Sequence, residues 1–473
     1  MIDTFIVDRF RALVGPHDSV VDPDRIAPRL VDWRGQKRGA SPLLLTPADT
    51  ETLAAIVRLA VETRTPLVPQ GGNTGLVGGA TPEADGLSIL VSMERMNRIR
   101  VLDADDFSVV AEAGVVLSAL HDAVSGVDRQ FPLSLGAKGS ATIGGLVSTN
   151  AGGTQVLRHG PMRSLVLGIE AVLPDGSVLD QLRPLRKDNS GYDIKQLLIG
   201  AEGTLGFVTA AALRLVPTPR DVATAFAAVT SPDAALALLG RLRAATGDCV
   251  DSFELVPRAA VDLVVRHVPG TRDPLVGAHA WYVLVEATSA APGDAMRRAL
   301  EAGLGKAIDE GLVADAAIAE SRAQAENLWR LRETIAEAER VDGPSVKHDI
   351  SVPVADMPRF MAEAGAVIEL EWAALGARVF AFGHLGDGNV HFNVKTDAPG
   401  PRAELMAVRH AISDRVYDLV AAFGGSISAE HGIGTSKAAA LARLGDPAKL
   451  AAMHAVKAAL DPIGIMNPGK ILG

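Results

Sequence analysis

Three glycine-rich segments close together in the sequence limit what this chain can fold into more than any other feature. They are PLVPQGGNTGLVGG (66–79), FPLSLGAKGSATIGGLVSTNAGG (131–153) and IGAEGTLGFVT (199–209). Each glycine gives up side-chain packing and costs backbone entropy on folding, so three such segments are hard to explain as turns alone. One extended ligand that passes all three segments explains them better.

The first segment joins a strand to a loop that could bind phosphate. Predicted strand 66–69 leads directly into glycines, Asn73 and Thr74, whose backbone N–H groups can turn inward around an anion. The segment lacks the dinucleotide-binding fingerprint G-x-G-x-x-G, because Asn73 or Thr74 stands where the second glycine belongs and no helix pattern follows. A tight loop of several turns would use the same residues, so this segment alone leaves both interpretations open.

The charge and the cysteine count exclude several classes of protein. With 46 Lys and Arg against 56 Asp and Glu, the formal net charge is −10, which disfavours nucleic acid and anionic membranes as partners. The single cysteine, Cys249, cannot form an intrachain disulfide, an iron–sulfur cluster or a four-cysteine zinc site. Redox chemistry in this chain would therefore need an organic cofactor, or a metal held by histidine and carboxylate.

No targeting signal or membrane span is recognisable in the sequence. The N-terminal MIDTFIVDRFRALVG mixes acidic and basic residues at helical spacing and has no apolar core followed by a cleavage site. The weakly charged stretch 131–157 is interrupted by Lys138 and by many small polar residues, so it cannot cross a bilayer as an apolar helix. From these features we expect a cytoplasmic protein.

The pattern of predicted elements indicates an α+β protein with several parts. Short strands alternate with helices up to Pro217, Thr218 and Pro219, where the dense motifs stop. Region 220–420 reads as helices and antiparallel strands, which predicts an α+β layer with helices on one face. Region 421–473 is predicted to be mostly helical. We therefore place domain boundaries at 1–219, 220–420 and 421–473.

A second group of residues has the composition of a catalytic metal site. In FGHLGDGNVHFNV (382–394), a predicted hairpin would bring His384 and His391 together, and SAEHGIGTSK (428–437) adds Glu430 and His431. Two histidines and one carboxylate, with open positions left, form a catalytic metal set. A single histidine here would more often be structural, but four candidates beside glycines or apolar strands favour a metal.

Two basic residues are candidates for binding an anion. On the predicted helix 328–338, Arg332 falls at the edge of an apolar stripe, where its guanidinium needs an anion or a carboxylate partner. Lys347 shares the polar face of its strand with Ser345, Asp349 and Ser351. Each alone is more often a solvated or salt-bridged side chain, whereas the two together could clamp a dicarboxylate.

The motifs resemble one family of flavoproteins over residues from about 30 to Lys470. They are PQGGNTGLVGG, PLSLGAKGS, NAGG, LRKDNSGYD, IGAEGTLG, GHLGDGNVHFNV, SAEHGIG and NPGK. The chain resembles the vanillyl-alcohol oxidase/p-cresol methylhydroxylase type, an FAD-binding oxidase/transferase family, and within it the D-lactate and D-2-hydroxyglutarate dehydrogenases. SLGAKGS together with LRKDNSGYDIKQLLIGAEGTLG is most similar to the D-2-hydroxyglutarate enzymes.

This resemblance implies a two-part FAD-binding domain over 1–219 and an antiparallel-sheet substrate, or cap, domain over 220–420. The helical segment 421–473 would pack on the FAD domain and complete the active site. Covalent-flavin members carry a histidine in the first loop, where this chain has Asn73, so the resemblance implies noncovalent FAD. The implied cofactor-binding residues are Pro69, Gly71, Gly72, Asn73, Thr74, Gly75, Leu76, Gly79, Pro132, Gly136, Gly139, Ser140, Thr142, Gly144, Gly145, Asn150, Gly152, Glu202, Gly203, Gly206 and Asn467.

The resemblance also implies a chemistry and assigns residues to it. His384, His391 and Glu430 match the ligands of a divalent metal, with zinc the expected ion. Arg332 and Lys347 match a carboxylate-binding pair, and Asn393 and His431 match further active-site positions. A metal bound to the substrate would lower the pKa of its 2-hydroxyl, so that His431 takes the proton while the C2 hydride passes to the flavin.

The implied substrate is D-2-hydroxyglutarate, oxidised to 2-oxoglutarate, with D-lactate and D-malate as alternatives. Ala336 replaces a family threonine that helps to hold the distal carboxylate, so the identity of the substrate stays open.

Two other classes of protein remain as alternative interpretations: a zinc metallohydrolase and a nonenzymatic nucleotide-binding regulator. Because the chain has no iron–sulfur relay, electrons must pass to an external acceptor, for which the resemblance implies an electron-transfer flavoprotein or quinone. The oligomeric state is not determined, and a homodimer is one option.

Overall fold

The computed structural model describes residues 2–396 and 402–473 and divides the chain into two compact units. The first unit consists of Met1–Gly153, Gly160–Thr218 and Glu430–Gly473. The second consists of Thr154–His159 and Pro219–Ala429. The chain passes from the first unit to the second between Thr218 and Pro219, and the end of the chain returns to the first unit.

A small mixed sheet holds the first glycine-rich loop. Its strand order is β1 (Ser19–Val20), β2 (Leu44–Leu45), β4 (Ile89–Ser92) and β3 (Leu67–Gln70), with β2, β4 and β3 parallel. Helix α3 (Thr50–Thr63) connects β2 to β3 and begins at Asp49, whose carboxylate accepts the N–H of Thr52. Its apolar face is buried, and α1 (Thr4–Val14) packs against it. The first loop starts directly after β3.

A five-stranded antiparallel sheet carries the rest of the first unit. Its order is β5 (Ile99–Asp103), β6 (Ser108–Glu112), β10 (Phe207–Arg214), β8 (Val166–Val172) and β9 (Val178–Gln181). An apolar core joins this sheet to α4 (Leu117–Ser125), α5 (Ile143–Thr149) and α7 (Met162–Leu165). The second glycine-rich segment includes α5, and the third leads into β10. The remaining elements of this unit are α2 (Pro23–Ile26), the 3-10 helix η1 (Ala27–Leu30), β7 (Arg129–Gln130), α8 (Lys195–Leu198), β11 (Val216–Pro217), α17 (Ala438–Leu444) and α18 (Pro447–Leu460).

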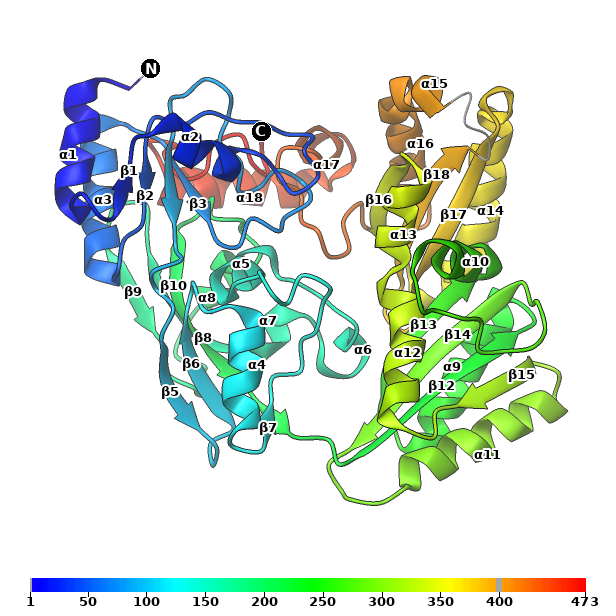
Figure 1. The fold of residues 1–473 in the computed structure, drawn as a ribbon. Helices are drawn as coiled ribbons and strands as arrows, with labels where there is room; N and C mark the ends of the chain where they lie inside the picture. Colours follow the sequence, from blue (N-terminus) through cyan, green and yellow to red (C-terminus); the bar gives the residue numbers. More distant parts are fainter. Residues whose placement is uncertain (1, 397–401) are drawn as a thin grey trace. The chain divides into compact units, whose positions relative to one another are not determined.

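The second unit is built on a seven-stranded antiparallel sheet. Its order is β15 (Val313–Ile318), β12 (Asp221–Val229), β14 (Trp281–Ser289), β13 (Val250–Pro257), β17 (Ala377–His384), β18 (Asn389–Thr396) and β16 (Val346–Ser351). One helix layer contains α10 (Arg258–His267), α12 (Arg322–Glu333) and α13 (Ile335–Asp342), and the other contains α9 (Pro232–Thr246), α11 (Ala295–Asp309), α14 (Met357–Glu371) and α16 (Arg409–Ala422) (Figure 1). The smaller elements are α6 (Val156–His159), η2 (Val354–Asp356), η3 (Ala373–Leu375) and α15 (Arg402–Ala407).

Two predictions about this unit need correction. Helices cover both faces of the sheet rather than one, because central strands such as β13 and β14 carry large apolar side chains on both faces and are buried on both. The helix predicted over 328–338 is divided at Thr334, whose hydroxyl donates to the carbonyl of Arg330. This bond to the preceding turn bends a helix and separates α12 from α13.

Phe392 provides a test of how much core packing stabilises β18, the strand that carries His391 and Asn393. The ring is fully buried on β18, between His391 and Asn393 in sequence, and packs against Phe360 of α14. We expect Phe392→Ala to lower the free energy of unfolding by about 3–5 kcal/mol, because a large cavity opens behind the strand. Urea unfolding followed by tryptophan fluorescence would measure the change. Leu370→Ala is the matched control on α14, since that side chain is 77% exposed, and an equal loss in both variants would contradict this account.

Candidate active site and cofactor cavity

The three glycine-rich segments line one cavity in the first unit. Its volume is about 350 Å³, within the range of small-molecule sites. The lining comes from β3 and the loop that follows it, from residues between 135 and 152, and from 202–208, with Glu430 and His431 from the C-terminal part of the chain. Segments far apart in the sequence therefore surround a single space, as a shared ligand requires.

Two glycines show why these loops tolerate no side chain. A Cβ on Gly72 would lie 1.8 Å from the carbonyl oxygen of Ser140, so the first and second loops meet backbone to backbone. Gly203 has φ +74°, and a Cβ there would lie 2.3 Å from Cγ of Pro69. Larger residues would push the three loops apart at both contacts.

Most of the predicted cofactor residues line this cavity. They are Pro69, Gly71, Gly72, Asn73, Thr74, Gly75, Leu76, Gly79, Gly136, Thr142, Gly144, Gly145, Gly152, Glu202, Gly203 and Gly206. The structure places five other predicted residues outside the lining: Pro132, Gly139, Ser140, Asn150 and Asn467. Asn150, for example, ends α5 in the left-handed conformation, and its side-chain oxygen accepts the N–H of Arg163. Its local role is to cap a helix.

Asn467 and Glu202 connect the cavity loops to one another and to the C-terminal segment by hydrogen bonds. The side-chain amide of Asn467 donates to the carbonyl oxygens of Gly79 and Glu202, at 2.9 and 2.7 Å, and so ties the first loop to the third. The Glu202 carboxylate accepts the N–H groups of Ile433 and Gly434 at 2.7 and 2.8 Å. Burial raises the pKa of Glu202, and these two N–H groups offset part of the rise.

The polar atoms of the cavity wall suit a ligand rich in hydrogen-bonding groups. Thr142 Oγ1 and Gln70 Oε1 are buried, and neither has a hydrogen-bond partner within residues 2–396 and 402–473. Both residues line the cavity. Because buried polar atoms are almost always paired, these two indicate a missing partner. A flavin nucleotide, with phosphates and ring heteroatoms, fits a cavity of this kind.

The candidate site residues of the second unit share one face of its sheet. The predicted hairpin over His384 and His391 is confirmed as β17 and β18, and the two imidazole centroids lie 5.5 Å apart. Across to β16, Asp349 faces His391 and Lys347 faces Asn393 in the strand register. Because side chains alternate between the two faces of a strand, these residues all project to one side. They lie on the side that α12 and α13 cover.

A buried carboxylate that the sequence did not single out holds two of these residues. Glu254 on β13 accepts from His384 Nδ1 at 2.6 Å and from Arg332 Nε at 2.7 Å. Burial alone would raise the pKa of Glu254, but the charges of His384 and Arg332 outweigh it and hold the pKa at about 2. The guanidinium of Arg332 also lies over the Phe382 ring, 5.0 Å from its centroid. The carboxylate partner that Arg332 requires is therefore Glu254. A glutamate inside the apolar strand FELV was the sequence signal for it.

Lys347 and Asn393 share a second buried carboxylate, Glu339 on α13. Lys347 Nζ and Asn393 Nδ2 both donate to Glu339 Oε2, at 2.7 and 3.0 Å. Nothing in the helical pattern of 335–342 marked this residue, because an isolated glutamate in an amphipathic helix usually faces solvent. Asp349, also missed as a site residue, is 3% exposed, accepts from Asn389 Nδ2 and lies 4.0 Å from His391 Nδ1.

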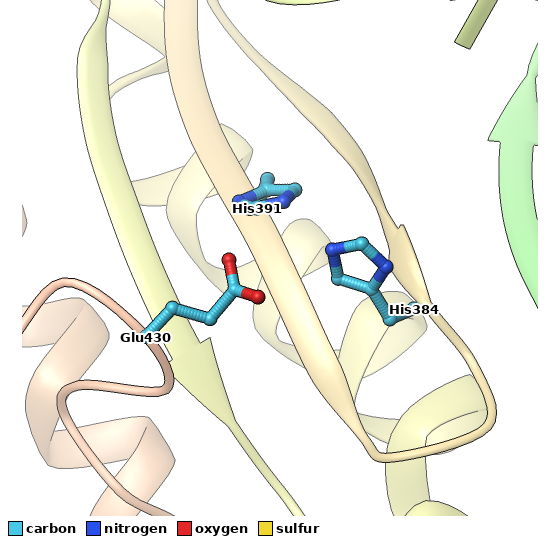
Figure 2. Close-up of side chains that lie close together, drawn as sticks. All are labelled: His384, His391 and Glu430. Carbon is cyan, nitrogen blue, oxygen red and sulfur yellow. The ribbon is translucent and has the colours of Figure 1, made fainter. Parts of the chain in front are cut away.

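The donor atoms of His384, His391 and Glu430 have the composition of a zinc site. Figure 2 draws these side chains close together, and one ligand atom from each lies within 4.8 Å of the others. Glu430 directly follows Ala429, the last residue of the second unit. His384 Nδ1 is hydrogen-bonded to Glu254, which leaves Nε2 to face a metal. In metal-binding histidines, the ring nitrogen that does not bind the metal usually donates to a carboxylate in this way. The side chains therefore fit a divalent metal.

The fold and the cavity define a flavoprotein, and comparison with known proteins agrees. The model of the C-terminal domain of FAD-linked oxidases matches residues 218–471, and the model of an FAD-binding domain matches residues 41–181. The structure of p-cresol methylhydroxylase covers 99% of this chain and 96% of its own with a TM-score of 0.77 at 16% identity, which supports the fold. The chain belongs to the FAD-linked oxidases. The expected α+β fold of the vanillyl-alcohol oxidase type is confirmed.

Two similar proteins are named as D-2-hydroxyglutarate dehydrogenases. The D-2-hydroxyglutarate dehydrogenase of Arabidopsis thaliana is 38% identical over 100% of this chain and 82% of the relative. That of Bos taurus is 40% identical over 97% of this chain and 82% of the relative. The chain is therefore an FAD-dependent oxidoreductase, as the motifs implied. The metallohydrolase and the nonenzymatic regulator are not supported.

The expected cytoplasmic location is wrong. Both relatives are named as mitochondrial proteins, which contradicts it. The expectation rested on the lack of a recognisable signal, and such a lack does not identify a compartment. Among the helices of residues 2–396 and 402–473, none combines the length and the apolar character that a membrane span requires.

Asn467 provides a test of the loop arrangement around FAD. We expect Asn467→Asp to raise the dissociation constant of FAD by roughly tenfold or more, because a carboxylate would then face two carbonyl oxygens at a site that is 1% exposed. The flavin-to-protein ratio after gel filtration and a fluorescence titration of the apoprotein would measure the loss. Asn97→Asp, at an exposed position of the same unit, should leave FAD binding unchanged. Full flavin retention in the Asn467 variant would refute the proposed tie between the loops.

Proposed function

We propose that the protein oxidises D-2-hydroxyglutarate to 2-oxoglutarate, with noncovalent FAD as hydride acceptor and a divalent metal, zinc expected, at His384, His391 and Glu430. The first unit would hold FAD, and the second would bind the substrate. The observation that carries the proposal is the pair of cations Arg332 and Lys347, each fixed by a buried carboxylate on one face of the second unit. The names of the two relatives support the same substrate.

Both cations have N–H groups left for an anionic ligand. Arg332 uses Nε for Glu254 and brings Nη2 to 3.4 Å from His384 Nε2, while Nη1 donates to no protein acceptor in the described part of the chain. Lys347 makes one hydrogen bond there, to Glu339, out of the three that an ammonium can donate. Two such cations suit a substrate with two carboxylates better than one with a single carboxylate.

The remaining roles follow the chemistry of alcohol oxidation. The cavity residues would hold FAD as the two-electron acceptor, and His384, His391 and Glu430 would hold a divalent ion that would supply Lewis-acid polarisation of the 2-hydroxyl. His431 would take the hydroxyl proton on its ring nitrogen as general base. Asn393, held by Glu339, would donate to a substrate oxygen, and Arg332 and Lys347 would fix the carboxylates and so the face of C2 that reacts.

Asn73 supports noncovalent attachment of the flavin. Its side-chain amide donates to the carbonyl of Val31 at 2.9 Å and lies in the cavity wall. An amide engaged in this way is not a nucleophile, so it offers no bond to the flavin ring. Acid precipitation should accordingly release all of the flavin into the supernatant.

D-Lactate and D-malate remain the alternative substrates. Ala336 lies near the start of α13 and is exposed. Because alanine has no hydroxyl, this position cannot donate a hydrogen bond to a distal carboxylate of the substrate. The nearby Thr334 hydroxyl is engaged with the carbonyl of Arg330. As electron acceptor we propose a separate electron-transfer flavoprotein or a quinone, because the single cysteine rules out an internal iron–sulfur relay.

Anaerobic reduction of the bound flavin by a panel of 2-hydroxy acids would test the substrate. We expect D-2-hydroxyglutarate to bleach the flavin absorbance at a lower concentration than D-lactate, because Arg332 and Lys347 can each take one of its two carboxylates. D-Malate has two carboxylates as well, so its comparison with D-2-hydroxyglutarate tests the length of the substrate chain. The L-isomers should fail, because a fixed carboxylate pair presents only one face of C2 to the flavin. Bleaching by D-lactate at equal or lower concentration would overturn the assignment of D-2-hydroxyglutarate. Lack of bleaching by every D-isomer would overturn the proposed reaction.

Metal removal would test the assigned donors. After dialysis against a chelator, we expect turnover to fall by about a hundredfold or more, since polarisation of the hydroxyl is lost. The flavin should stay bound, because most of the cavity lining comes from the glycine-rich segments and not from the metal donors, and added Zn²⁺ should restore turnover. His391→Ala should give the same loss with zinc absent by elemental analysis, whereas His279→Ala is the matched control, as His279 is not one of the proposed metal donors. Full turnover by metal-free enzyme would remove the metal from the mechanism.

A further inference from the structure

Glu339 is a buried charge of the second unit that the proposed reaction does not itself use. Its side chain is 1% exposed, and three side chains donate to it. Ser345 Oγ donates to Oε1 at 2.8 Å, and Lys347 Nζ and Asn393 Nδ2 donate to Oε2 at 2.7 and 3.0 Å. Burial of a carboxylate is costly unless it is paired and hydrogen-bonded, and here both oxygens are occupied.

The strand register explains why one oxygen reaches two site residues. Lys347 on β16 and Asn393 on β18 are direct cross-strand partners, so their side chains leave the sheet side by side on the same face. Glu339 on α13 packs over this face and accepts from both with a single oxygen. The relative position of the ammonium and the amide is therefore fixed by Glu339 as well as by the backbone.

Ser345 prevents the carboxylate from turning away. Its hydroxyl engages Oε1, and it lies just before β16, two residues from Lys347. With one oxygen held by Ser345, the other stays directed at Lys347 and Asn393. Glu254 holds Arg332 and His384 in a parallel way, so each cation of the site has its own buried carboxylate and one further side chain tied to it.

We propose that Glu339 is a positioning residue for the oxidation of the dicarboxylate: it fixes Lys347 and Asn393 together in the orientation that binds the substrate. This rests on the proposed function, in which Lys347 takes a substrate carboxylate. Glu339 does not touch the substrate in this proposal, and it acts only through the two side chains that it holds.

Charge and position lead to opposite expectations for Glu339→Gln. Removal of a negative charge beside Lys347 would strengthen the attraction for a carboxylate and lower KM, if charge alone mattered. A positioning role instead requires KM to rise, because the neutral amide holds the Lys347 ammonium less tightly and frees Asn393. The direction of the change therefore distinguishes the two.

The experiment compares four variants of the FAD- and metal-loaded enzyme with D-2-hydroxyglutarate. We expect Glu339→Gln to raise KM roughly tenfold and to lower kcat, with a matching rise in the dissociation constant of 2-oxoglutarate measured by calorimetry. Ser345→Ala, which removes one bond and no charge, should shift KM the same way by roughly twofold to threefold. Glu339→Asp keeps the charge but shortens the side chain, so it should fall between wild type and Glu339→Gln. Glu337→Gln, exposed on the same helix, should match wild type.

The outcomes separate this proposal from the proposed function. If the wild type does not oxidise D-2-hydroxyglutarate, the proposed function fails. If the wild type does so, and Glu339→Gln has an unchanged or lower KM and dissociation constant, the positioning role is refuted. If Glu339→Gln loses its flavin or its thermal transition, the KM of Ser345→Ala tests the proposal instead. An unchanged KM in Ser345→Ala would then refute the positioning role.

Discussion

Two buried carboxylates, Glu254 and Glu339, set the arrangement on which the candidate site depends. A carboxylate that is about 1% exposed must be paired with cations or hydrogen-bond donors, since the loss of hydration is otherwise not recovered. Glu254 meets this need with Arg332 and His384, and Glu339 meets it with Lys347, Asn393 and Ser345. The same bonds that satisfy the carboxylates hold the functional side chains in place.

This arrangement also moderates the charge of the site. Each cation has a carboxylate partner before any ligand arrives, yet Arg332 and Lys347 retain N–H groups that can bind further oxygens. In the proposed function, a substrate carboxylate would meet donors of fixed orientation, so little side-chain entropy would be lost when it binds. In that proposal, orientation more than net charge is what these pairs contribute to recognition.

The first unit solves a different problem, which is to bring four separate segments around one ligand. Gly72 allows a backbone contact with Ser140, and Gly203 allows the Pro69 ring to approach, where a Cβ would forbid both contacts. Asn467 ties the loops of Gly79 and Glu202 together. Asn467 was predicted from the motifs as a cofactor residue, but the structure gives its side chain to the protein backbone instead. A motif residue can thus be required for a site through the loops that it connects.

The sequence by itself determined the flavoprotein family, the glycine-rich loops of the cavity and the hairpin that pairs His384 with His391, because these features depend on local motifs and on strand alternation. It also placed Lys347 and Asp349 on the polar face of one strand. It could not show that helices cover both faces of the sheet, that the helix divides at Thr334, or that Glu254 and Glu339 are buried. Those features were decided only by the tertiary structure. The partners of Glu254 lie far away in the sequence and become its neighbours only when the sheet forms. Glu339 becomes buried only when α13 packs over β16 and β18, which brings it to Lys347 and Asn393.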